Sequence, residues 1–105
     1  MLVERDGELA SLLAFVLRQA GYESCAAIDA AGALRLIQLE DPALALLAHG
    51  GPELDALELC REIRKRAALP IMVLSTHDRE EDLVAAFDAG ADDFLRKPFS
   101  PRVLL

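Results

Sequence analysis

The feature that most constrains the fold of this chain is a regular alternation of short apolar runs with longer stretches of helical periodicity. Segments of strand length are predicted at five places, residues 1–3, 22–28, 43–47, 71–74 and 92–95, of which the second and fifth include polar residues. The stretches between them repeat apolar residues at i, i+3, i+4 and i+7, which is typical of a helix that buries one face. Strands that alternate with helices predict a parallel sheet, covered on both faces and joined by right-handed crossovers.

Capping residues indicate where the expected helices begin and end. An Asp stands before each of four helical stretches: Asp6, Asp29, Asp55 and Asp78. A short acidic side chain at this position accepts hydrogen bonds from the first free N–H groups of a helix. The expected helix ends are Gly21, about Leu39, about Ala67 and Gly90. Residues 102–105 leave room for one turn of a fifth helix, so we expect that helix to be truncated.

Composition limits the classes of protein that fit. With 105 residues, 53% of them apolar and 28% charged, the chain fits one soluble globular domain. A net charge of −7 argues against a nucleic-acid surface, which needs clustered Lys and Arg. No apolar run approaches the ~20 residues that span a bilayer, and no signal-peptide pattern opens the chain. Cys25 and Cys60 are expected to be buried thiols, so the predicted location is the cytoplasm.

Polar residues gather where the expected strands end. The ligand crevice of an open parallel sheet lies beyond the carboxyl ends of its strands. The residues that follow four of the expected strands are Glu4-Arg5-Asp6, Ala48-His49, Ser75-Thr76 and Arg96-Lys97. These residues are therefore the candidates for a functional site.

The chain resembles the receiver domain of bacterial two-component response regulators over its whole length. The segments that carry the resemblance are residues 57–64 (LELCREIR), 70–75 (PIMVLS) and 89–101 (AGADDFLRKPFSP). They are most similar to the subfamily with a C-terminal winged-helix DNA-binding domain. The resemblance implies a flavodoxin-like, doubly wound sheet of five parallel strands in the order 2-1-3-4-5. It also implies that residues 1–105 are the receiver domain and that a DNA-binding domain would lie outside this chain.

The family transfers a phosphoryl group from a histidine kinase to an Asp at the end of the third strand. Mg²⁺ is held by that Asp and by an acidic pair after the first strand, and a Lys and a hydroxyl contact the phosphoryl oxygens. Three positions match this pattern: Glu4, Ser75 and Lys97. Two positions depart from it, because Arg5 stands at the second acid and Ala48 stands at the phosphoacceptor. Asp6 lies one place later, at a less constrained position.

The resemblance therefore implies a chemically disabled site, with no catalytic residue, no metal and no cofactor. The preferred interpretation is a non-enzymatic, phosphorylation-independent receiver domain that serves as a regulatory and dimerisation module of a transcriptional regulator. One alternative is a small-ligand sensor that uses the crevice bounded by Ala48, His49, Ser75 and Lys97. Another is a receiver that still accepts phosphate on a different carboxylate.

A second departure concerns the expected homodimer surface. In this subfamily the fourth helix, fifth strand and fifth helix form a dimer through ion pairs. Leu83 and Val103 are apolar where a basic residue and a Glu are common, and the surface is expected to include Asp92 and Asp93. One possibility is that these two apolar side chains simply face the core or solvent. The other is that a dimer interface held by salt bridges has become a permanent interface held by apolar contact.

Overall fold

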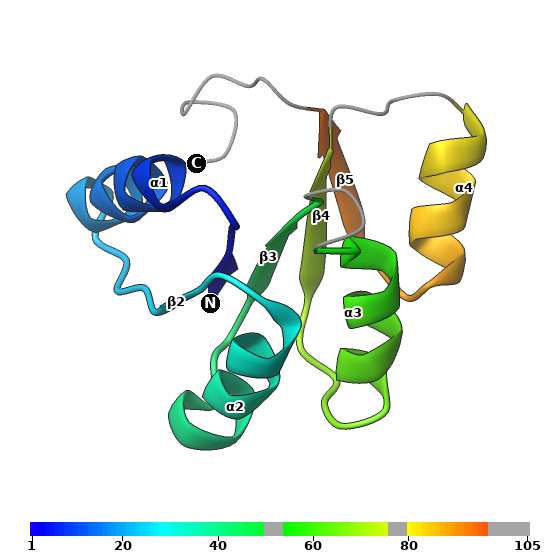
Figure 1. Ribbon diagram of the computed structural model, residues 1–105, viewed down its shortest axis with the longest axis horizontal. Helices are drawn as coiled ribbons and strands as arrows, with labels where there is room; N and C mark the ends of the chain where they lie inside the picture. The colour runs from blue at the N-terminus through cyan, green and yellow to red at the C-terminus, as the bar shows by residue number, and fades with distance from the viewer. Residues whose placement is uncertain (50–53, 76–79, 97–105) are drawn as a thin grey trace.

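The computed structural model describes residues 1–49, 54–75 and 80–96. In this part of the chain, a five-stranded parallel sheet has helices against both of its faces (Figure 1). The strands are β1 (Leu2–Val3), β2 (Ala26–Ala27), β3 (Ala45–Ala48), β4 (Ile71–Ser75) and β5 (Asp93–Arg96). The helices are α1 (Gly7–Gln19), α2 (Ala30–Glu40), α3 (Ala56–Arg64) and α4 (Glu80–Asp88).

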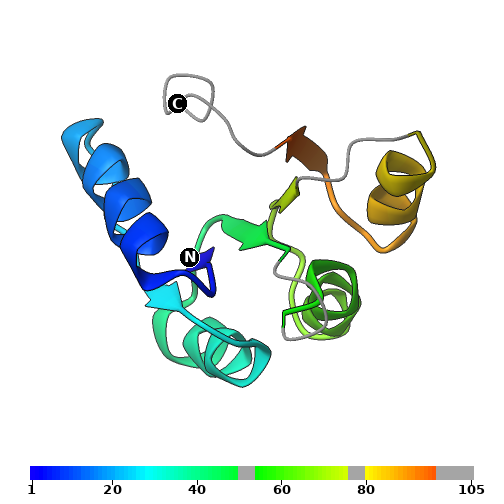
Figure 2. The ribbon, with the colours of Figure 1, turned by 45° about the horizontal axis from the view of Figure 1, so that its top comes forward.

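The strand order is β2-β1-β3-β4-β5, and every neighbouring pair is parallel. The predicted flavodoxin-like, doubly wound sheet is therefore confirmed. Figure 2 shows α1 alone on one face of the sheet and α2, α3 and α4 on the other. The expected fifth helix at residues 102–105 lies outside the described residues.

The two faces of the sheet are buried against different helices. Side chains alternate along a strand, so Leu2 and Leu46 pack against α1 while Val3 and Leu47 pack against α2 and α3. All four are at most 4% exposed. This burial on both sides explains why the apolar runs are continuous and do not alternate with polar residues.

Three of the four predicted Asp caps are described, and all three are confirmed. Asp6 accepts hydrogen bonds from Glu8 N–H and Leu9 N–H, at 3.0 and 3.3 Å. Asp29 caps α2 through Gly32 N–H, and Asp55 caps α3 through the N–H groups of the second and third helical residues. The fourth, Asp78, lies outside the described residues.

Several predicted boundaries were wrong. The second strand was expected over residues 22–28, but β2 contains only Ala26–Ala27. This strand lies at the edge of the sheet and pairs with β1 alone, so only the two residues opposite Leu2–Val3 have a partner. The third helix was expected to reach Ala67 but ends at Arg64, where the chain turns toward β4.

In the part of the chain that is described, no helix has the length and apolar character needed to cross a membrane.

Candidate functional site

The carboxyl ends of β1, β3 and β4 bring three candidate residues to one edge of the sheet. The strands run in register, with Val3 opposite Leu47 and Ala48 opposite Leu74. Glu4 follows β1 directly, Ala48 ends β3 and Ser75 ends β4. The structure therefore places these three positions at one edge of the sheet.

All three residues are buried, which is unusual for the two that are polar. Glu4 is 3% exposed, Ser75 5% and Ala48 0%. The Glu4 backbone donates to Ala27 O at 3.0 Å, and its carboxylate accepts from Asp6 N–H at 3.2 Å. Both Glu4 and Ser75 make further polar interactions in the structure. Two buried polar side chains thus lie at the ends of β1 and β4, and the strand between them, β3, ends in the methyl group of Ala48.

The acidic residues after β1 have different tasks. Asp6 is exposed and its Oδ1 is engaged in the cap of α1. Its carboxylate therefore stabilises the first turn of the helix, where the N-terminal end of the macrodipole favours negative charge. Arg5 lies between Glu4 and Asp6 and is exposed. Lys97, the remaining matched position, lies outside the described residues.

The residues present do not fit the Mg²⁺ that the family uses. Mg²⁺ requires oxygen ligands in near-octahedral geometry and is held by carboxylates. Ala48 offers no side-chain oxygen, and Arg5 places a cation directly after Glu4 in the chain. Among the described residues, no three His, Cys, Asp or Glu side chains gather in a way that could hold a metal ion.

His49 has a structural role that its sequence position did not reveal. Its Nδ1 accepts a hydrogen bond from Ala56 N–H at 3.2 Å, while its own backbone N–H donates to Leu74 O at 2.8 Å. An accepting Nδ1 is unprotonated, so in neutral His49 the proton is on Nε2. His49 thereby ties the end of β3 to the first residue of α3. An His seven residues before a helix start has no local capping signature, and only the fold brings the two together.

A small cavity of about 50 Å³ lies beside this tie, next to Ser75. Its lining residues are His49, Leu57, Val73, Ser75, Asp82 and Phe94. A cavity of this size holds about one or two water molecules. Sites for drug-sized ligands are roughly 300–1,000 Å³, so the described cavity is too small for such a molecule.

The residues expected at a dimer surface do not share one environment. Leu83 is half-buried on α4, whereas Asp92 and Asp93 are exposed at the start of β5. Asp92 Oδ2 accepts hydrogen bonds within the same chain, from Arg64 Nη2 at 2.6 Å and from Ile71 N–H at 2.8 Å. Val103 lies outside the described residues.

The fold and the site together define a class of protein: an open, doubly wound α/β domain with its polar centre beyond the ends of β1, β3 and β4. The family model of the response regulator receiver domain matches residues 1–105, so the chain belongs to the receiver domain family.

Solved structures agree with this assignment. The receiver domain of NtrX from Brucella abortus is 36% identical, with a TM-score of 0.88, and the match covers 98% of this chain and 88% of that one. The BeF3-activated N-terminal receiver domain of RstA from Klebsiella pneumoniae is 30% identical, with a TM-score of 0.90 and the same two coverages. The chemotaxis protein CheY4 from Vibrio cholerae, at 25% identity, has a TM-score of 0.92 and again covers 98% and 88%.

Proposed function

We propose that this receiver domain acts without phosphorylation, as a regulatory and dimerisation module of a bacterial transcriptional regulator. The observation that carries the proposal is Ala48, whose fully buried methyl group ends β3 between the buried Glu4 and Ser75. Transfer of a phosphoryl group requires a nucleophilic oxygen at the acceptor position and cationic charge to offset the incoming dianion. A methyl group provides no nucleophile, and of the carboxylates that would hold the metal only Glu4 remains at a matching position.

A separate output domain, as in the proposed transcriptional regulator, is supported by one relative and by the charge of the chain. The RstA structure is described as an N-terminal receiver domain. The net charge of −7 is unsuited to direct contact with phosphates, so DNA binding would belong to another domain. Signalling would then shift an equilibrium between two surface states through a partner and not through phosphate.

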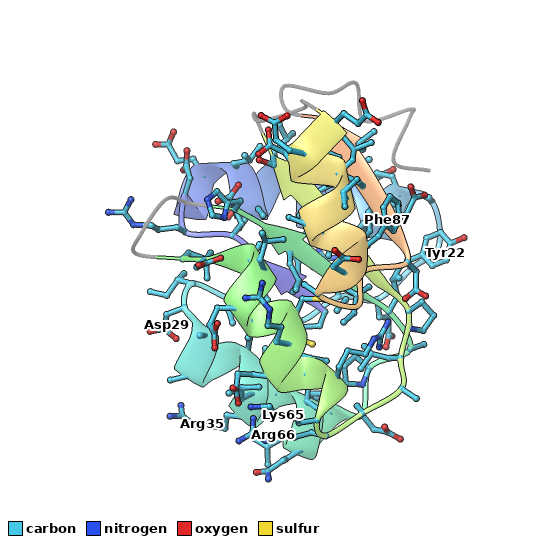
Figure 3. All side chains as sticks on the ribbon, turned by 90° about the vertical axis from the view of Figure 1, so that its right-hand side faces the viewer. Tyr22, Asp29, Arg35, Lys65, Arg66 and Phe87 are labelled. Carbon is cyan, nitrogen blue, oxygen red and sulfur yellow. The ribbon has the colours of Figure 1, made fainter. Side chains whose placement is uncertain are left out.

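Dimerisation is supported by apolar side chains on α4. Val84 is 52% exposed and Phe87 47% exposed, and they lie one and four residues after the half-buried Leu83. Figure 3 shows Phe87 on α4. We call Leu83, Val84 and Phe87 the α4 patch. Burying such a patch contributes about 25 cal/mol per Å², whereas an exposed ion pair contributes ~0–1 kcal/mol. An apolar α4 patch therefore favours association that needs no phosphorylation.

The small-ligand alternative has weaker support. As lined by the described residues, the cavity beside Ser75 and His49 measures about 50 Å³, which is smaller than the usual site for a drug-sized ligand.

The experiment that tests the proposal repairs the site in two steps. Incubation of the native chain with Mg²⁺ and a small-molecule phosphodonor is expected to leave its intact mass unchanged. Ala48→Asp alone restores the nucleophile, but the positive charge of Arg5 remains and repels the metal. Weak Mg²⁺ binding is therefore expected. Ala48→Asp combined with Arg5→Asp is expected to bind Mg²⁺ at least tenfold more tightly and to gain one phosphoryl group.

Titration calorimetry measures the metal affinities and mass spectrometry the phosphoryl group. The matched control is Ala48→Asp with Arg18→Asp, which makes the same charge change on α1, far from the site. A phosphorylated native chain would contradict the proposal. Equal Mg²⁺ affinity in the double variant and in its control would show that Arg5 does not exclude the metal.

A further inference from the structure

The N-terminal end of α3 takes its hydrogen-bond acceptors from two places in the chain. A helix leaves its first N–H groups without partners inside the helix. Asp55 accepts hydrogen bonds from the N–H groups of residues 57–59, through its side chain and its backbone oxygen, at 3.0–3.2 Å. The N–H of Ala56 instead has His49 Nδ1 as its acceptor, at 3.2 Å. His49 therefore completes the cap of α3.

The bond between His49 and Ala56 exists in only one protonation state of the imidazole. A backbone N–H can only donate, so Nδ1 must offer a lone pair. Ala56 is 1% exposed, and a buried N–H without an acceptor is costly. When the imidazole takes up a second proton, Nδ1 becomes a donor that faces another donor. The added positive charge also lies at the N-terminal end of α3, where the helix dipole disfavours a cation.

A second partner for the charged ring lies beside this bond. Side chains alternate along a strand, and both Leu47 and Val73 pack on the face of the sheet covered by α2, α3 and α4. His49 and Ser75, each two residues later, therefore belong to the same face. Both line the cavity of about 50 Å³, together with Asp82 of α4. A carboxylate this close favours an imidazolium over a neutral imidazole.

Charged groups on each neighbouring element bear on this choice. Those at the adjoining ends of α3, α4 and β1 are Asp55, Glu58, Glu80, Glu81, Asp82, Glu4 and Arg5. On α3, Asp55 Oδ1 is engaged in the cap, and the exposed Glu58 pairs with Arg61. On α4, Glu80 and Glu81 line a different groove.

The two charged residues after β1 lie elsewhere. Glu4 stands two positions after Leu2, which packs against α1, so alternation directs its side chain to the face away from His49. Arg5 is exposed, where water and salt screen its charge. Of these described side chains, only Asp82 lines the cavity with His49.

We propose that His49 is a pH-sensitive switch at the junction of β3 and α3. The neutral imidazole holds the start of α3 through Ala56 N–H. The imidazolium releases Ala56 and pairs with Asp82, so a fall in pH moves a contact of β3 from α3 to α4. The ring of a histidine ordinarily changes charge between pH 5 and 8, and the switch needs neither phosphate nor a dimer. It therefore goes beyond the function proposed above.

A ¹⁵N NMR titration of the chain between pH 5 and 8 tests the switch. At pH 8 the Nδ1 signal of His49 is expected at the position of an unprotonated ring nitrogen. The Ala56 amide signal is expected to move with the same midpoint as the His49 ring. Its protection from hydrogen exchange, corrected for the intrinsic rate, is expected to fall about tenfold or more. The internal control is Gly32 N–H, which Asp29 caps on α2 at 2.8 Å and which is expected to stay fixed.

Variants of His49 separate the switch from a structural role. The chain has one other histidine, His77, and His77→Gln identifies its ring signal. His49→Asn keeps a side-chain acceptor for Ala56 N–H but does not titrate, so protection at Ala56 is expected to stay high across the range. His49→Ala has no acceptor, and low protection is expected at every pH.

Variants of α4 test the second partner. In Asp82→Asn, His49 is expected to bind its proton about threefold or more weakly, because the neutral amide no longer favours the imidazolium. Asp88→Asn makes the same change at the exposed C-terminal end of α4 and is expected to leave proton binding unchanged.

Three results would overturn the proposal. The first is an Nδ1 that carries a proton at pH 8, and the second is a pH-dependent Ala56 signal that persists in His49→Asn. The third is equal proton affinity of His49 in Asp82→Asn and Asp88→Asn, which would exclude α4 as the second partner. The titration needs no phosphodonor, so its outcome is separate from that of the phosphorylation experiment.

Discussion

At the scale of single residues, one arginine holds three segments together. Arg64, on the last turn of α3, donates to Leu69 O, to Gly90 O at 2.9 Å and to Asp92 at 2.6 Å. Gly90 has a φ of 108°, and a Cβ there would lie 2.7 Å from Arg64 Cγ. Both the positive φ and the close contact therefore require glycine. Arg64 thus joins α3 to the chain before β4 and to the turn before β5.

This arrangement predicts the effect of removing Asp92. Asp92→Ala takes one acceptor from Arg64 and the side-chain acceptor from Ile71 N–H, so it is expected to lower the free energy of unfolding by ~1–2 kcal/mol. Glu58→Ala is the matched control, because both side chains of the Glu58–Arg61 ion pair are exposed. Its effect is expected to stay within ~0.5 kcal/mol. Urea denaturation measures both, and equal effects would contradict a structural role for Asp92.

At the scale of elements, the two exposed apolar helix surfaces differ in their setting. The α4 patch lies beside β5, on the face of the sheet covered by α2, α3 and α4 (Figure 2). On α1, Leu12 and Phe15 are 52% and 57% exposed, on the other face. The proposed dimer uses the first surface, so the second provides an internal comparison of nearly equal exposure.

Substitutions on the two helices therefore make a matched pair. Phe87→Arg and Leu83→Arg are expected to shift a dimer toward monomer by at least tenfold in dissociation constant, because each buries a charge in an apolar interface. Phe15→Arg is expected to leave the dissociation constant unchanged. Sedimentation equilibrium measures all three. A native chain that stays monomeric at high concentration, or a dimer broken by Phe15→Arg alone, would rule out the α4 patch.

At the scale of the whole molecule, the partly buried Met1 amino group and the buried Cys60 thiol respond to pH in opposite directions. Burial lowers the pKa of the Met1 amino group below 8.0 and raises the pKa of the Cys60 thiol above 9.0. Between the folded pKa of the amine and 8.0 the unfolded chain binds more protons, so stability rises with pH. Above 9.0 the unfolded thiol ionises more readily than the folded one, so stability falls.

The free energy of unfolding, measured with urea between pH 6.5 and 10.5, is therefore expected to pass through a maximum near pH 8–9. Acetylation of the amino terminus is expected to remove the rise below the maximum, and Cys60→Ala is expected to reduce the fall above it. A profile unchanged by either modification would contradict this account of the two groups.

Particular residues show which features of the fold and of the site can be predicted from the sequence. The caps at Asp6, Asp29 and Asp55 could be predicted because capping is a local matter of one side chain and the next three N–H groups. The convergence of Glu4, Ala48 and Ser75 could be predicted too, since in an all-parallel sheet the carboxyl ends share one edge. The length of β2 could not be predicted, because an edge strand extends only as far as the neighbouring strand provides backbone hydrogen-bond partners.

Periodicity and residue identity are enough to predict the alternation of strands and helices, the polar edge of the sheet and the methyl group at its centre. Two further contacts depend on the tertiary structure: His49 joins β3 to α3, and Asp92 binds Arg64. These contacts join residues from separate segments of the chain. Their geometry is set by how the helices pack on the sheet, which no local pattern encodes.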